Sequence, residues 1–66
     1  MDDHKLNLML EEATRRIPQG NPLQDLARRF LATRRLADRR GRRYPPLDQY
    51  QDKLDQMAEI LDMEYR

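Results

Sequence analysis

The sequence predicts an all-α protein of three helices, over about residues 3–17, 22–40 and 46–65. In each range apolar residues recur at steps of three and four, which is the period of an α-helix. Proline and glycine separate the ranges. The chain contains no valine and two isoleucines, so a strand pattern is absent. We expect one small helical domain, residues 1–66, in which a helical hairpin precedes a third amphipathic helix after a Pro-Pro corner.

The first helix is expected to begin at a cap formed by Asp2 or Asp3, which places negative charge at its positive end. Arg15 and Arg16 fall in its last turn, where cations interact favourably with the helix dipole. A turn over residues 18–21 follows. The apolar stripe of this helix consists of Leu6, Met9, Leu10, Ala13 and Ile17.

The second helix has clear start and stop signals. Asn21 is a good N-cap, Pro22 suits the first helical position, and Gln24 is three residues after the cap, as in a capping box. Gly41 is the expected C-terminal stop. Arg34 lies inside the apolar stripe, so either its stem snorkels along the core edge or it pairs with an acid from another element. The stripe contains Leu23, Leu26, Ala27, Phe30, Leu31 and Ala37.

The third helix follows a corner at which Tyr44 and Pro45 are expected to be extended and Pro46 to open the helix. Its acids lie opposite its apolar face. That face needs a cover, which this chain, a second copy or another protein could provide. The apolar face consists of Leu47, Tyr50, Leu54, Met57, Ala58, Leu61 and Tyr65, and the acidic stripe of Asp48, Asp52, Asp55, Glu59 and Asp62.

Charge is distributed unevenly along a chain whose formal net charge is only +1. Residues 1–43 hold 11 basic and 6 acidic side chains (+5), whereas residues 44–66 hold 2 basic and 6 acidic ones (−4). Arginine presents a planar fork that binds carboxylate or phosphate in a bidentate manner. The candidate basic patch, for nucleic acid or an acidic partner, consists of Arg28, Arg35, Arg39, Arg40, Arg42 and Arg43.

The composition offers few of the side chains that enzymatic catalysis requires. The chain has no cysteine and no serine, and its one histidine is His4, close to the first residue. Acids along a helix do not converge on a cation as ligands in a loop do. We therefore expect no catalytic residues, no metal, no cofactor and no small-molecule substrate.

The composition also bears on location. The first residues are acidic and no apolar run follows them, so we expect no secretion by a signal peptide and no membrane partner. The expected location is the host cytoplasm or a virion.

The segment Arg43-Tyr44-Pro45-Pro46-Leu47-x-Gln49-Tyr50-x-Asp52 resembles a short motif, Tyr-Pro-Pro-x-x-[Asp/Glu]-[Gln/Tyr]-x-Asp, that recurs in small proteins of tailed bacteriophages. The resemblance covers ten residues and departs from the motif at Gln49, where an acid is commoner, and at Gln51, where an aliphatic residue is commoner. Some of those phage proteins look like tail components or assembly factors. The resemblance implies a phage structural or assembly role.

Together these features predict a non-enzymatic protein–protein association module, oligomeric or bound to a larger protein. The alternative is an arginine-rich, helical nucleic-acid-binding protein, in which the basic patch would follow phosphates. Aromatic and large apolar side chains are the usual anchors of protein interfaces. The candidate partner-binding residues are Tyr44, Tyr50, Met57, Leu61 and Tyr65.

Overall fold

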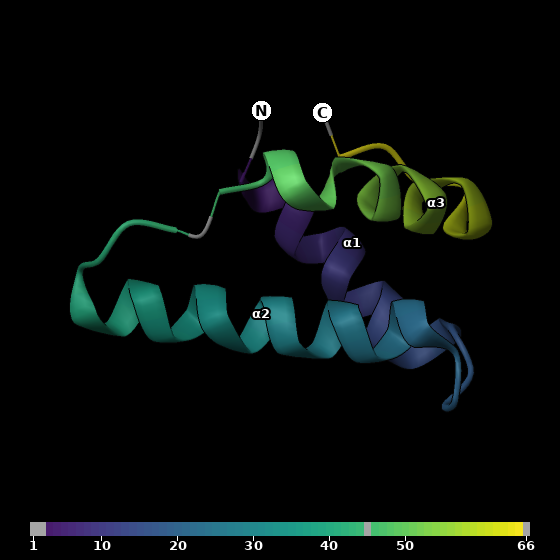
Figure 1. Ribbon diagram of the computed structural model, residues 1–66, viewed down its shortest axis with the longest axis horizontal. Coiled ribbons are helices and arrows are strands. Elements are labelled where there is room, and N and C mark those ends of the chain that lie inside the picture. The colour runs from purple at the N-terminus through teal and green to yellow at the C-terminus, as the bar shows by residue number, and fades with distance from the viewer. Residues whose placement is uncertain (1–2, 45, 66) are drawn as a thin grey trace.

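The computed structural model describes residues 3–44 and 46–65 and confirms an all-α fold. It contains α1 (Asp3–Arg16), α2 (Pro22–Arg40), the short 3₁₀ helix η1 (Asp48–Tyr50) and α3 (Gln51–Leu61). α1 packs against both α2 and α3, whereas α2 and α3 make few direct contacts with each other. In Figure 1, α2 and α3 lie on opposite sides of the view and α1 crosses between them. The predicted cap at Asp2 and the extended conformation expected at Pro45 lie outside the described residues.

One core joins the three helices. The predicted stripe of α1 is buried throughout, and it meets the buried side chains of α2 and α3. The apolar face of the third helix is therefore covered within the chain. The core cluster consists of Leu6, Met9, Leu10, Ala13, Ile17, Leu23, Ala27, Phe30, Leu31, Leu54, Met57, Leu61 and Tyr65.

The ends of α2 follow the sequence signals closely. The side chain of Asn21 accepts a hydrogen bond from the backbone N–H of Leu23 at 2.9 Å, as expected of an N-cap. Gly41 adopts the left-handed conformation (φ 63°), and the N–H of Arg42 bonds to the carbonyl of Ala37, which completes a Schellman motif. The predicted capping box is wrong. Gln24 instead donates from Nε2 to the carbonyl of Thr14 in α1, because its side chain is buried between the helices.

The third helix is shorter than the predicted range 46–65. Pro46 does not open it, because the chain first forms η1 and then bends at Tyr50 (φ −110°, ψ 3°) before α3 begins. At the other end Asp62 takes the left-handed conformation (φ 54°), and the N–H of Met63 bonds to the carbonyl of Ala58. This second Schellman motif ends the helix and returns the last described residues toward the core.

The returning segment carries Tyr65 into the core, where 3% of the residue is exposed. Its hydroxyl donates to a carboxylate oxygen of Asp55 and accepts from Nε2 of Gln51 at 2.8 Å. A tyrosine hydroxyl needs such partners when it is buried. The two side chains of α3 therefore hold the end of the chain against the helix that it has just left.

Arg34 is the largest buried charged side chain, with 1% of the residue exposed. Its Nε donates to Oδ1 of Asn7 in α1 at 2.8 Å, and its guanidinium carbon lies 4.1 Å from the centroid of the Tyr44 ring. Burial to this extent rules out snorkelling, one of the two alternatives that the sequence left open. The partner described on α1 is an amide, and the ring of Tyr44 brings the segment after α2 back over the core.

No helical stretch of the described chain combines the length and the apolar character that a membrane crossing requires.

We expect Leu54→Asp to abolish cooperative folding. Leu54 is fully buried, and an unpaired carboxylate there costs roughly 3–5 kcal/mol, comparable with the whole stability of a domain this small. Thermal denaturation followed by circular dichroism measures the effect. Asp52→Asn, on the exposed side of the same helix, is the control: it removes a helix-dipole interaction of only about 0.3–1 kcal/mol, so the protein should remain cooperatively folded. Similar melting of both variants would contradict this core.

We expect Arg34 and Tyr44 to be energetically coupled. A double-mutant cycle with Arg34→Met and Tyr44→Leu should give a coupling free energy of about 0.5–2 kcal/mol in urea denaturation, the range of a partly desolvated cation–π contact. Tyr44→Phe keeps the ring and removes only the hydroxyl that donates to Asp38, so this control should retain the coupling. Additive effects of the two substitutions would show that the ring does not stabilise the charge.

Candidate interaction surface

The exposed side of α2 carries the strongest concentration of charge in the described chain. Arg28, Arg35 and Arg39 lie at steps of seven and four, so they share one edge of the helix over roughly 16 Å. All three are exposed because the opposite side of α2 is packed into the core. The sequence correctly predicted that these side chains form one edge.

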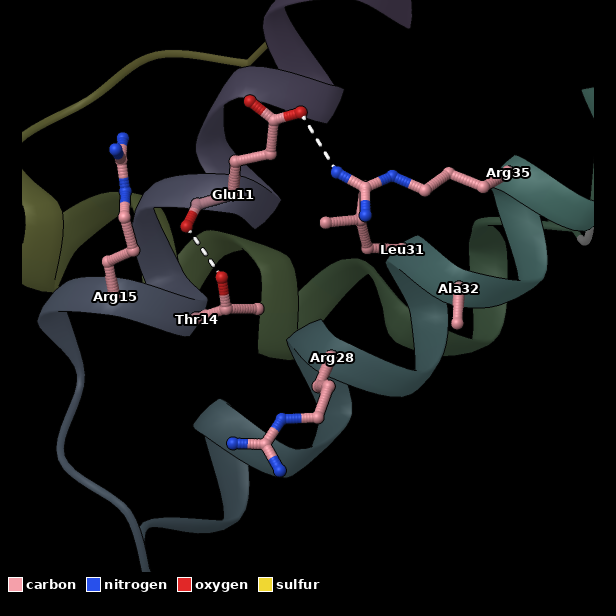
Figure 2. Close-up of a pocket in the computed structure, with 7 residues that line it drawn as sticks. All are labelled: Glu11, Thr14, Arg15, Arg28, Leu31, Ala32 and Arg35. Carbon is pink, nitrogen blue, oxygen red and sulfur yellow. Dashed lines mark hydrogen bonds and ion pairs between the residues drawn. The ribbon is translucent and has the colours of Figure 1, made fainter.

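A hollow separates this edge from α1. It has a volume of about 600 Å³ and is lined by side chains of both helices. Figure 2 shows Glu11 of α1 directed toward Arg35 of α2, and the two side chains lie 3.3 Å apart (Arg35 Nη2 to Glu11 Oε1). Arg15 and Arg28 extend in opposite directions in the same view. The lining residues are Glu11, Thr14, Arg15, Arg28, Leu31, Ala32 and Arg35.

A second hollow continues the first one along α2. It has a volume of about 530 Å³ and is lined by Ala32, Arg35, Leu36 and Arg39, so it shares Ala32 and Arg35 with the first hollow. Leu36 is 44% exposed, which is high for a large apolar side chain. Two aliphatic side chains thus lie beside the row of arginines. We call Arg28, Ala32, Arg35, Leu36 and Arg39 the basic face of α2.

The arginines of this region are only partly neutralised. Glu11 pairs with Arg35, and Glu12 pairs with Arg15 and Arg16 on α1. No carboxylate of residues 4–44 or 46–65 lies within ion-pair distance of Arg28 or Arg39. The Arg35–Glu11 pair is itself well exposed, and such a pair contributes little stability, about 0–1 kcal/mol. The basic face is therefore available to an anion from outside the chain.

The rest of the predicted basic patch lies around the C-terminal end of α2. Arg40, Arg42 and Arg43 line a smaller hollow of about 160 Å³ together with Thr33, Leu36 and Ala37. Leu36 belongs to both this hollow and the one beside Arg39. The patch is thus divided into two groups of arginines that flank one exposed leucine. The sequence analysis did not identify Leu36 as a surface residue. Its position outside the apolar stripe of the second helix could have indicated that it is exposed.

The predicted partner-binding residues have a different environment. Met57, Leu61 and Tyr65 are buried in the core, so their side chains are not part of the surface of this fold. Tyr50 packs edge-on against Phe30, with ring centroids 5.2 Å apart, and Tyr44 lies over Arg34. A role for these five residues in binding a partner stays a prediction. For Met57, Leu61 and Tyr65 it would require the core to open.

The described residues contain no group of three or more His, Cys, Asp or Glu side chains that could hold a metal ion. Comparison of the chain with protein-family models, with curated proteins and with solved structures finds no match to any of them.

Proposed function

We propose that this chain is a non-enzymatic protein-association module that binds a carboxylate-bearing partner through the basic face of α2. One observation carries the proposal: exposed arginines without a described ion pair stand beside exposed aliphatic side chains, on a helix whose other side is fixed in the core. Arginine favours bidentate contact with carboxylates, and Ala32 and Leu36 add apolar area that a protein partner can bury.

Because the core is closed, a partner would bind a surface other than the apolar face of the third helix. The sequence left open whether this chain, a second copy or another protein covers the third helix, and α1 and α2 supply the cover. A partner would then bind a preformed surface, which avoids the cost of ordering the helix on binding. Exposed ion pairs would set orientation and partner choice, and burial around Leu36 would contribute most of the affinity.

The motif at residues 43–52 supports a phage particle or its assembly as the setting in which this module would act. Its resemblance to small phage proteins makes a virion component or an assembly intermediate the first kind of partner to test.

The proposal predicts binding of an acidic amphipathic peptide. A synthetic helical peptide with Glu and Leu at i, i+4 spacing should shift the NMR signals of Arg28, Arg35, Leu36 and Arg39. The double variant Arg28→Glu/Arg39→Glu should weaken binding at least about tenfold, since each exposed contact is worth up to about 1 kcal/mol and the reversed charges repel. Leu36→Ser should also weaken it.

The control for this experiment is Lys53→Glu, a charge reversal of the same kind on the exposed side of α3, which should bind like the original protein. Signal changes confined to other parts of the chain, or equal affinities for all variants, would refute the proposed face.

Nucleic acid is the second candidate ligand. Several exposed arginines between residues 28 and 43 have no ion pair within the described chain, and this favours nucleic acid as a ligand. These are Arg28, Arg29, Arg39, Arg40, Arg42 and Arg43.

A salt titration separates the two candidates. Phosphate binding to a duplex should weaken as salt rises, and Arg28→Gln/Arg39→Gln should reduce the slope of log affinity against log salt by about 2. Leu36→Ser should leave this binding unchanged, because a phosphate backbone buries no apolar surface there. Absence of binding to duplex and single-stranded probes at low salt would eliminate nucleic acid as the ligand.

A further inference from the structure

We infer that the partner of the basic face is a second copy of this chain, which docks the outer side of its α3 there in a head-to-tail arrangement. The inference rests on the proposed function and identifies the partner of the same surface. Four features favour a second copy as the partner: the charge of α3, its separation from α2, the spacing of the charges, and one exposed large aliphatic side chain on each face.

The outer side of α3 is acidic and unpaired. Asp52 and Glu59 lie seven residues apart, so they occupy nearly the same side of the helix, and both are exposed. Asp48 and Asp62 extend the negative charge beyond the two ends of α3. No basic side chain of the described ranges lies within ion-pair distance of these four acids. Ile60, beside Glu59, is 55% exposed. We call Asp52, Glu59 and Ile60 the acidic face of α3.

The two charged faces do not neutralise each other within one copy. α1 packs against both α2 and α3, and the two outer helices make few direct contacts (Figure 1). The ion pairs described for the chain all join arginines to Glu11 and Glu12 of α1. Arg28 and Arg39 of α2 and Asp52 and Glu59 of α3 therefore carry complementary charges that no ion pair among the described residues satisfies.

The faces also match in dimensions. Arg28 and Arg35 are seven residues apart on α2, as are Asp52 and Glu59 on α3, and each pair spans roughly 10 Å of helix. Each face includes one exposed large aliphatic side chain, Leu36 on α2 and Ile60 on α3. Contact between two such helices would pair the charges and remove both apolar side chains from water.

The arrangement predicts a particular kind of oligomer. The two faces belong to different helices, so the contact is heterologous and each copy keeps one free face after docking. Assembly therefore continues beyond a dimer, into a ring or an open chain. A weak contact is expected, because its charges are exposed and screened by salt.

Sedimentation equilibrium tests the inference with the full chain. At low salt the average mass should rise with concentration from 8.0 kDa and should pass the mass of two copies, and high salt should return it to one copy. Arg28→Gln/Arg39→Gln and Asp52→Asn/Glu59→Gln should each self-associate about tenfold more weakly. None of these four side chains has a described ion pair, and Arg39 and Asp52 each lose a helix-dipole interaction of about 0.3–1 kcal/mol, so both variants should remain cooperatively folded.

Mixing the two variants gives the decisive result. Each variant keeps the face that the other lacks, so their equimolar mixture should form a complex of two copies that does not grow further. The same neutral substitutions combined in one chain should give a monomer at all concentrations.

Three outcomes would overturn the inference: an original protein that stays at 8.0 kDa up to millimolar concentration in low salt, a mass that saturates at a closed dimer, or a mixture that does not associate. Binding of the acidic amphipathic peptide to α2 by a strictly monomeric protein would leave the proposed function standing and refute only self-association. Failure of both experiments would refute both.

Discussion

The mutual covering of three amphipathic helices is the constraint on which this structure depends. With no cysteine and 66 residues, the chain has no disulfide to assist a core of limited size. α1 completes the core by packing its buried stripe against both other helices. This packing buries most large apolar side chains of the described chain. The surface left for other molecules is therefore mainly charged, with Leu8, Leu36 and Ile60 as its exposed large apolar residues.

Two polar side chains that enter this core, Arg34 and Tyr65, are held by hydrogen bonds, whereas the buried Oε1 of Gln24 has no partner among the described residues. Arg34 bonds to Asn7 and lies over Tyr44, and the Tyr65 hydroxyl bonds to Asp55 and Gln51. An unsatisfied polar group in such a small interior would cost a large part of the total stability. These contacts also position the two segments that follow α2 and α3, which have no helical hydrogen bonds of their own. The buried polar side chains thus determine the path of the chain between and after its helices.

The separation of charge between α2 and α3 is the feature most relevant to function. A closed core makes the surface of α2 rigid, so its arginines are presented at fixed helical spacing. Because α1 holds α2 and α3 apart, their opposite charges face outward instead of cancelling. A protein partner and a nucleic-acid partner would differ in which side chains of this surface they contact. Both can use the arginines, but only a protein partner gains from burying Leu36.

The sequence by itself determined the number of helices, the buried faces of α1 and α2, and the edge formed by Arg28, Arg35 and Arg39. These features follow from helical period and from local capping chemistry at Asn21 and Gly41, which act over a few residues.

Only the tertiary structure decided where α3 begins and ends, what covers its apolar face, and what holds Arg34. The turn at Asp62 is stable because it returns Tyr65 to the core, and the bend at Tyr50 places its ring against Phe30. Such contacts join residues distant in sequence, so no local pattern could specify them. Helical period predicted one uninterrupted helix over residues 46–65, and the burial of Tyr65 and the packing of Tyr50 against Phe30 outweighed the continuation of its hydrogen bonds.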